Sequence, residues 1–302
     1  MDFTLRELEC FTAVAEELSF TRAAQRLHLA QPPLSRHIRT LEDRLGSALF
    51  DRSNRKVALT PAGAVFYEET RTIMPQLTRA GETTRRFASG QTERLRLGFV
   101  SAVLSPELVE VLRRFREHYP EVQLLMQDLP PSEQLAALRR GTLDGGFIGL
   151  APGERTPGIQ IVPWRYETLA AFIPFGHPLA TRRQIDISAF AGEALVAVSA
   201  DAAPAFARYL QTLCSDAGFR PKIVLDSPRA QAVAVMVAAG TGIALLPSSL
   251  SRVVGDAAAI VPVRKAPRIT HVFARPAGTP DTAMRKFSAL ITHRPEARRL
   301  SK

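Results

Sequence analysis

The sequence is poor in the features that mark exported, membrane-spanning or disulfide-stabilised proteins. Only two cysteines, Cys10 and Cys214, occur in 302 residues, which excludes a disulfide framework. Cys10 falls in an amphipathic segment, where a cysteine usually serves as buried packing. No segment reaches the apolar length needed to cross a bilayer, and the start MDFTLRELE lacks the apolar core of an export signal. We therefore expect a soluble, cytoplasmic protein with no membrane partner.

Signatures of catalysis and metal binding are also missing. The chain has no G-x-S-x-G, no Walker loop and no H-E-x-x-H, and its six histidines are scattered without ligand spacing. The run Gly240-Thr241-Gly242 follows a predicted helix and precedes a predicted strand, which is the wrong order for a dinucleotide-binding loop. We therefore expect a binding protein with no catalytic residue, no metal and no cofactor, rather than an enzyme.

Two amphipathic helices joined by a short turn are predicted between Ser19 and Gly46. Pro32 and Pro33 suit the first turn of the second helix, where backbone N–H groups lack partners. Four apolar residues at helical spacing predict the buried face of that helix, and they are Leu34, Ile38, Leu41 and Leu45.

The other face of this helix-turn-helix carries guanidinium and hydroxyl donors suited to DNA phosphates and purine edges. No acidic residue occurs between Glu17 and Glu42, so the local sequence does not repel a polyanion. The alternative is an ordinary solvated basic helix. The candidate DNA-binding residues of this segment are Thr21, Arg22, Gln31, Pro32, Pro33, Ser35, Arg36 and Arg39.

A wing is predicted after the second helix. Residues 49–52 and 57–60 have the pattern of two short strands, and the polar run between them suits a tight turn. Arg52, Arg55 and Lys56 would then be positioned for phosphates or a narrow minor groove. The alternative is a solvated turn without a DNA contact.

A long helix is predicted from Pro61, with Thr60 as its cap, to Ala88, where a polar hinge begins. Pro75 removes one helical hydrogen bond, so we expect a bend near Arg71 but no break. One stripe follows alternating spacings of four and three, and we expect it to pair two subunits because it buries nothing within its own. The stripe consists of Phe66, Thr70, Ile73, Leu77, Ala80, Thr84 and Phe87.

From Arg94 onward, short apolar strands alternate with helices, which predicts parallel α/β sheets. The run YETLAAFIP predicts a crossing into a second lobe, and RITHVFARP predicts the return. Ligands of open α/β sheets bind beyond the carboxyl ends of strands, where helix N-termini favour anions. Alternatively, the serines at these corners only cap helices. The candidate effector-binding residues at the corners are Ser101, Gln127, Pro130, Pro131, Ser199, Asp201, Pro204 and Phe206.

Several ordered motifs resemble one known family. The runs SFTRAA, LAQPPLSRHIRTLEDRLG, LFDR and LTPAG are similar to the DNA-binding region of LysR-type transcriptional regulators. The G-x-x-D-x-G-F run at 141–147, HPLA at 177–180 and VAAGTGIALLP at 237–247 resemble landmarks of the family's two-lobed effector domain.

This resemblance implies an α/β multidomain architecture. An all-α winged helix-turn-helix would occupy residues 1–60, and a dimerising linker helix would occupy residues 61–90. A two-lobed α/β effector-binding domain of periplasmic-binding-protein type would follow at 91–302. Its lobe I would span about 91–164 and 268–293, and its lobe II about 165–267.

The resemblance also implies function. It predicts a regulator that binds an interrupted inverted repeat in double-stranded DNA as a tetramer, contacts RNA polymerase and activates a metabolic or catabolic operon. Thr241 would add an effector contact. Regulators that sense dicarboxylates often carry arginine where this chain has Gly149, so we expect a different organic anion, such as an aromatic acid.

Two other classes share the α/β scaffold. A solute-binding protein would explain residues 91–302, but it would need a secretion signal and no DNA-binding segment. A small-molecule enzyme would need a nucleophile and base, and the sequence offers no such pair.

Overall fold

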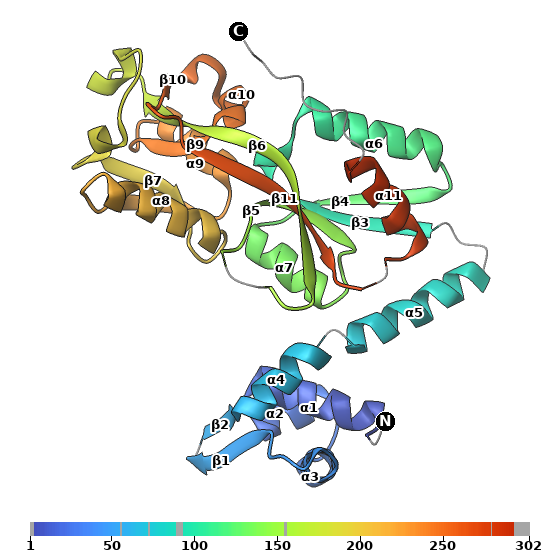
Figure 1. Ribbon diagram of the computed structural model, residues 1–302. Helices are drawn as coiled ribbons and strands as arrows, with labels where there is room; N and C mark the ends of the chain where they lie inside the picture. The colour runs from blue at the N-terminus through green and yellow to red at the C-terminus, as the bar shows by residue number, and fades with distance from the viewer. Residues whose placement is uncertain are drawn as a thin grey trace. The chain divides into compact units, whose positions relative to one another are not determined.

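The computed structural model describes residues 3–54, 56–71, 73–88, 93–153, 156–278 and 280–292. The chain divides into two compact units (Figure 1), one formed by residues 1–89 together with residues 139–141 and the other by residues 90–138 and 142–302. Each unit has a core of its own. Within the described residues, no helix is both long and apolar enough to cross a membrane.

The first unit is built on three short helices, α1 (Leu5–Glu17), α2 (Phe20–Arg26) and α3 (Gln31–Leu45). Thr4 and Glu7 form a capping box that satisfies the first N–H groups of α1. Leu34, Ile38 and Leu41 of α3 are fully buried against α1, as the periodicity predicts. Leu45 is 36% exposed, so the prediction was wrong for this residue: it lies in the last turn, next to the Gly46 cap, beyond the packed part of α3.

Two antiparallel strands, β1 (Phe50–Asn54) and β2 (Lys56–Leu59), form the predicted wing. Phe50 at the start of β1 packs against Phe11 and Phe20, which ties the wing to the three-helix core. The strands run closer to the tip than predicted. Arg55, at the predicted turn, lies outside the described residues.

The predicted long helix is two helices, α4 (Pro61–Thr70) and α5 (Ile73–Ala88), so the expectation of an unbroken helix was wrong. Arg71, where α4 ends, lies four residues before Pro75. A proline has no N–H for the carbonyl four residues earlier, and its ring clashes with that carbonyl. Pro75 therefore accounts for the interruption at the place where a bend was predicted.

The apolar stripe of this region has two different roles, which the sequence did not separate. Phe66 is partly buried and packs edge-to-face against Phe3 and Phe11 of its own unit, and Thr70 is buried at 5% exposure. Ile73 and Leu77 are 36% and 47% exposed. The idea that the whole stripe buries nothing in its own subunit is therefore wrong for its α4 half. The side chain of Phe87 lies outside the described residues.

The second unit contains the predicted alternation of strands and helices in two lobes. Its strands are β3 (Glu93–Phe99), β4 (Val122–Asp128), β5 (Gly145–Leu150), β6 (Ile159–Pro174), β7 (Ala194–Val198), β8 (Lys222–Ser227), β9 (Ala244–Pro247), β10 (Ala258–Pro262) and β11 (Arg268–Pro276). Its helices are α6 (Pro106–His118), α7 (Pro131–Arg139), α8 (Pro204–Asp216), α9 (Ala230–Ala238), α10 (Ser251–Val254) and α11 (Thr282–Thr292).

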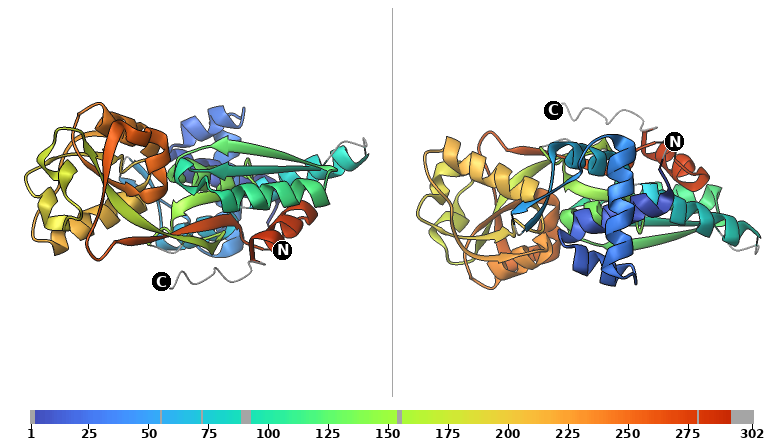
Figure 2. Two further views of the ribbon diagram at one scale, coloured as in Figure 1. Left: turned by 90° about the horizontal axis from the view of Figure 1, so that it is seen from above. Right: turned by 90° about the horizontal axis from the view of Figure 1, so that it is seen from below.

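The main sheet is mixed, whereas the sequence predicted parallel sheets. Strand β3 pairs in parallel with β4 and β5, but β6 and β11 are antiparallel to each other over nine residue pairs from Arg268↔Thr168 to Pro276↔Ile159. From Leu169 onward β6 pairs instead with β9 and β10. These two long strands therefore run from one lobe into the other (Figure 2).

The glycine-rich G-x-x-D-x-G-F run at 141–147 allows close packing in the first lobe. Asp144, 3% exposed at its side chain, accepts hydrogen bonds from the backbone N–H and the guanidinium of Arg96. A Cβ at Gly145 would collide with the ring of Phe273, and one at Gly146 would collide with the amide of Gln134. The motif thus lets β5 pack closely against its neighbours, and it contributes no ligand group.

Candidate DNA-binding surface and interlobe pocket

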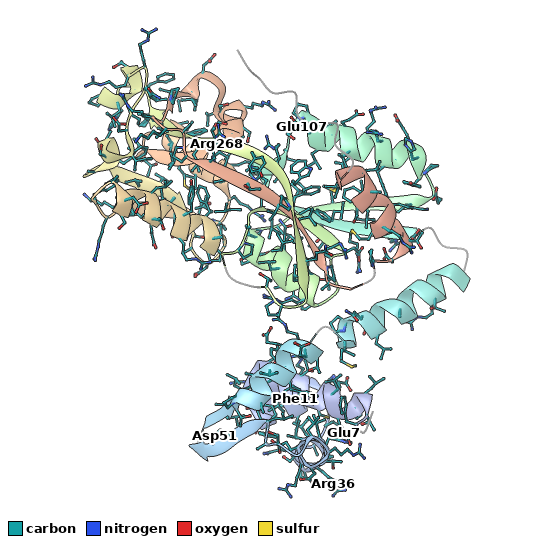
Figure 3. The ribbon with its side chains drawn as sticks, in the orientation of Figure 1. Glu7, Phe11, Arg36, Asp51, Glu107 and Arg268 are labelled. Atoms are coloured by element: carbon teal, nitrogen blue, oxygen red, sulfur yellow. The ribbon has the colours of Figure 1, made fainter. Side chains whose placement is uncertain are left out.

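The exposed face of α3 presents the predicted donors around its N-terminus. Gln31, Pro32, Arg36 and Arg39 are exposed, and Ser35 is half-buried. Within the described part of the chain, neither arginine forms an ion pair, so both guanidinium groups can meet an anion. Arg36 projects away from the core residue Phe11 (Figure 3). The geometry fits a helix that enters a major groove by its first turns.

The arginines of α2 have a different environment. Arg22 donates to the carbonyl of Glu17 and pairs with the Glu17 carboxylate at 3.4 Å, and Arg26 pairs with Glu16 at 2.5 Å. The stretch of sequence without acidic residues therefore does not form a surface without acidic residues. The fold brings the end of α1, with its two glutamates, beside α2. Thr21 is exposed next to them.

The side chains of the wing residues Arg52, Arg55 and Lys56 lie outside the described residues. Their predicted contact with DNA therefore stays a prediction. The antiparallel pairing of β1 with β2 supplies the scaffold that it needs.

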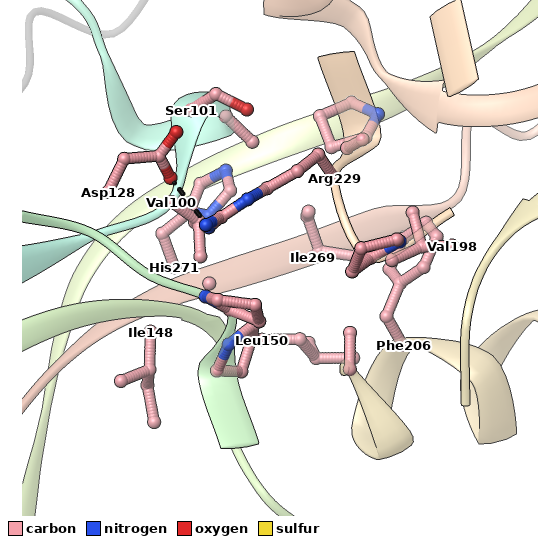
Figure 4. Close-up of a pocket in the computed structure, with 18 residues that line it drawn as sticks. Val100, Ser101, Asp128, Ile148, Leu150, Val198, Phe206, Arg229, Ile269 and His271 are labelled. Atoms are coloured by element: carbon pink, nitrogen blue, oxygen red, sulfur yellow. Dashed lines mark hydrogen bonds and ion pairs between the residues drawn. The ribbon is translucent and has the colours of Figure 1, made fainter. Parts of the chain in front are cut away.

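An apolar pocket lies between the two lobes of the second unit (Figure 4). The first lobe contributes the ends of β3, β4 and β5 and the start of α7, and the second lobe contributes the ends of β7 and β9 and the starts of α8 and α9. Its walls consist mainly of Val100, Pro130, Pro131, Ile148, Leu150, Val198, Phe206, Pro228 and Ile269. Such walls suit the ring or chain of a small apolar molecule.

The more exposed side of the pocket carries a bridge between the lobes. Arg229, just before α9, donates to Asp128 at the end of β4 across 3.0 Å, and Figure 4 shows this pair. Both side chains are partly exposed, at 36% and 41%. Ser132 at the start of α7 donates its backbone N–H to the carbonyl of Ala202 at 3.1 Å. The lobes are therefore joined at this side by polar contacts that a ligand can replace.

The buried side of the pocket carries a polar cluster. His271 on β11 is 1% exposed, and its Nε2 lies 2.6 Å from Oε2 of Glu167 on β6. Glu167 also accepts from Arg165 at 2.9 Å and from the backbone N–H of Ser249 at 2.6 Å. Burial raises the pKa of Glu167, but the hydrogen bonds from His271 and Ser249 outweigh it and leave the pKa below its usual value. The Glu167 carboxylate is therefore ionised at neutral pH.

The structure brings four of the predicted effector residues to the pocket, namely Ser101, Pro130, Pro131 and Phe206. It does not bring the other five, Gln127, Ser199, Asp201, Pro204 and Thr241, to the lining. Gln127 faces away because neighbours on a strand point to opposite faces, and Asp128 takes its place. Thr241 precedes β9, whereas Pro247 at the carboxyl end of β9 lines the pocket.

Ser199, Asp201 and Pro204 belong to the turn between β7 and α8. Asp201 and Pro204 are exposed, and the pocket is lined from this region by Val198, Ala203 and Phe206. The turn therefore approaches the pocket with its apolar residues.

Sequence reasoning missed Arg229 and His271. Arg229 could have been predicted from the rule that ligands bind beyond the carboxyl ends of strands, because it follows β8 at the carboxyl end of that strand and precedes a helix. His271 gave no such signal, since it sits in the middle of an apolar strand. Gly149 has φ +76°, so an arginine there would be strained, and the arginine in the pocket lining is Arg229 from the other lobe. Among the described residues, no cluster of three or more His, Cys, Asp or Glu side chains is arranged to hold a metal.

Comparison with known proteins gives the same division of the chain. Residues 5–64 match the model of the bacterial regulatory helix-turn-helix protein, lysR family, and residues 88–295 match the LysR substrate binding domain. The chain is 34% identical to the HTH-type transcriptional regulator AlsR of Bacillus subtilis over 248 residues, which are 82% of each chain. It is 35% identical to CatR of Pseudomonas putida over 82% of this chain and 84% of CatR.

Solved structures agree over almost the whole length. Full-length BenM matches with a TM-score of 0.56 and 30% identity, and the match covers 96% of this chain and 95% of BenM. Full-length CbnR in complex with its target DNA matches with a TM-score of 0.55 and 26% identity, over 96% of this chain and 98% of CbnR. From its helix-turn-helix, its two-lobed second unit and these matches, we conclude that the chain belongs to the LysR family of DNA-binding transcriptional regulators and is not an enzyme.

Proposed function

We propose that this regulator controls a metabolic or catabolic promoter in response to a small organic anion that binds between the lobes of its second unit. The observation that carries the proposal is the Arg229–Asp128 pair at the pocket. A carboxylate that reaches Arg229 competes with Asp128, and therefore changes a contact that joins the two lobes. Ligand binding and lobe arrangement are thereby coupled.

An anion fits the pocket better than a cation. The apolar walls hold the body of the ligand, and the guanidinium of Arg229 can form a bidentate pair with a carboxylate. Asp128 opposes an anion only while it remains beside Arg229. Because both side chains are partly exposed, Asp128 can turn to solvent at small cost.

The proposed activity on DNA is sequence-specific recognition of an interrupted inverted repeat. Arg36 and Arg39 of α3 would read base edges or phosphates, and the wing would contact the backbone. The exposed Ile73 and Leu77 of α5 would pair two subunits, and two such dimers would form a tetramer. One similar protein, 32% identical over 81% of this chain, is the probable cat1 operon transcriptional activator of Acinetobacter lwoffii, and this likeness favours activation. Contact with RNA polymerase is part of the same proposal.

A promoter experiment tests the proposal. The full chain is mixed with the promoter region of its neighbouring genes, and footprinting is carried out with and without a panel of aliphatic and aromatic acids. We expect at least one acid to change the footprint or the affinity, and Arg229→Ala to abolish that response while the footprint without acid is kept. If only amines change the footprint or the affinity, the proposal that the effector is an anion is wrong.

A further inference from the structure

A second pocket is lined by residues of the long strands β6 and β11 and of the segment that follows β9, and each lining residue carries a charge or a hydroxyl group. The charged residues are Arg165 and Glu167 on β6, Arg252 in α10 and Arg268 on β11 (Figure 3). The other lining residues all carry a hydroxyl group, and they are Tyr166, Thr168, Ser248, Ser249 and Ser251. This pocket therefore combines positive charge with hydroxyl donors, whereas the pocket between the lobes is apolar.

Among the described residues, the one acid of this lining is already engaged. The Glu167 side chain is 4% exposed, and its carboxylate accepts hydrogen bonds from the guanidinium of Arg165 at 2.9 Å and from the backbone N–H of Ser249 at 2.6 Å. Its Oε2 also lies 2.6 Å from Nε2 of His271. Because Glu167 is held by these contacts, it leaves the other two arginines of the lining without a carboxylate.

Those two arginines, Arg252 and Arg268, are both exposed, and within the described parts of the chain neither forms an ion pair. Like charges that line one pocket repel each other, and an anion between them offsets that repulsion. The hydroxyl of Tyr209 donates to the backbone carbonyl of Arg268, a contact that does not involve the guanidinium. Two guanidinium groups are therefore available to a ligand in this pocket.

Arg165 supplies a third guanidinium, which the fold holds in place. Its Nη2 donates to Glu167 at 2.9 Å and to the backbone carbonyl of Ala102 at 3.1 Å. Its Nε is buried and has no hydrogen-bond acceptor among the described residues. A buried donor without an acceptor is costly, so a ligand oxygen that reaches Arg165 would be stabilising.

A phosphate group matches this set of donors better than a carboxylate does. It carries a charge of about −1.5 to −2 near neutral pH and three strong acceptor oxygens, whereas a carboxylate carries one charge and two oxygens. The planar guanidinium fork pairs with phosphate oxygens in a bidentate geometry. The serine and threonine hydroxyls of the lining can donate to the oxygens that remain. Three arginines beside one engaged acid also disfavour a cation as the ligand.

We propose that this pocket binds a phosphate group, either as free phosphate or as part of a small phosphomonoester, and that Arg252 and Arg268 are its main charged contacts. Its lining shares no residue with the pocket between the lobes, so the inference goes beyond the proposed function and does not depend on it. The two pockets are joined by hydrogen bonds, because Arg165 and Ser249 both donate to the carbonyl of Ala102, which lines the pocket between the lobes.

The test is isothermal titration calorimetry of the full chain at fixed ionic strength and about pH 7.5, where phosphate groups are mostly dianions. The probes are inorganic phosphate and glycerol 3-phosphate, with acetate and succinate as carboxylate controls. We expect at least one phosphate probe to bind about 10-fold more tightly than either control, because it pairs with more than one arginine. If inorganic phosphate binds as tightly as glycerol 3-phosphate, the phosphate group alone is recognised. If only glycerol 3-phosphate binds, the ligand is a phosphomonoester.

Two substitutions locate the site. Arg252→Gln and Arg268→Gln each remove one positive charge from an exposed side chain, so folding should be retained, and thermal unfolding checks this. Each should weaken phosphate binding about 5-fold, because one charge-assisted hydrogen bond is lost. Arg208→Gln is the matched control, since Arg208 is an exposed arginine outside both linings, and it should leave phosphate binding unchanged.

Phosphate bound elsewhere on the chain is detected with two further variants. If Arg36→Ala removes phosphate binding while Arg252→Gln and Arg268→Gln keep it, the phosphate lies on the DNA-binding surface and the inference is wrong. If Arg229→Gln removes it instead, the phosphate occupies the pocket between the lobes, and the inference is again wrong.

Two results with the wild-type chain would also overturn the inference. If succinate binds as tightly as the phosphate probes, the pocket does not select phosphate. If neither phosphate probe binds, the pocket is not a phosphate site. The proposed function is judged separately, because it stands as long as an organic acid changes the DNA footprint and Arg229→Ala abolishes that change.

Discussion

Replacing Arg36 by alanine tests whether the exposed face of α3 reads bases. Arg36 is exposed and, within the described residues, forms no ion pair, and alanine is the best helix former, so the substitution should leave folding unchanged. A bidentate arginine contact to guanine contributes about 1–3 kcal/mol of discrimination. The affinity for the preferred sequence should therefore fall roughly 5- to 150-fold.

The assay is fluorescence anisotropy on two duplexes at several salt concentrations. One duplex is selected by the wild-type protein from a random library, and the other is a scrambled control. Arg36→Lys keeps the charge but loses the planar fork, so it should lose specificity and keep the salt dependence. Arg26→Ala is the matched control, because Arg26 is paired with Glu16 and Glu17 and should have little effect.

Two results would refute the reasoning. If Arg36→Ala weakens both duplexes equally and lowers the salt slope by about one, Arg36 contacts a phosphate and not a base. If neither affinity changes, Arg36 lies outside the DNA interface and the exposed face of α3 is an ordinary solvated surface.

Three further predictions concern assembly, stability and chemistry. Leu77→Asp should convert dimers to monomers in sedimentation at micromolar concentration, since Leu77 is 47% exposed, and unchanged mass would contradict pairing through α5. Asp144→Ala should cost about 3 kcal/mol in urea unfolding, because it leaves Arg96 partly buried without its carboxylate, and a loss under about 1 kcal/mol would contradict this. Burial raises the pKa of Cys10 to about 11, so iodoacetamide should not label Cys10 in the folded protein at pH 8, and rapid labelling would show that α1 opens.

Local patterns were sufficient where one helix or strand buries one face. The spacing of Leu34, Ile38 and Leu41 predicted the packing of α3, and the proline at 75 located the interruption after α4. The packing partners of Phe66 could not be predicted in the same way. A heptad stripe does not show whether its residues pack against a second subunit or against their own domain. Here Phe66, the first residue of the stripe, packs against Phe11 of its own domain.

The residues that line the pocket were even harder to predict from local sequence patterns. The rule that ligands bind beyond the carboxyl ends of strands selected corners from which four residues line the cavity, and their contact with an effector stays a prediction. Which residues of a strand face the pocket depends on which of its two faces packs inward, and the sequence around β4 does not show this, so Asp128 and not Gln127 lines the pocket. His271 reaches it only because β11 crosses between lobes, a contact between segments more than a hundred residues apart.

The crossing of β6 and β11 also bears on how the second unit unfolds. Many two-lobed proteins are joined by loops, and each lobe can then open as a separate cooperative unit. Here the hydrogen-bond ladder between β6 and β11 continues through the junction, and β6 goes on to pair with β9 and β10. Neither lobe can lose its share of these strands without exposing backbone groups of the other. Native-state hydrogen exchange should therefore report one common opening energy for amides of both lobes along these strands.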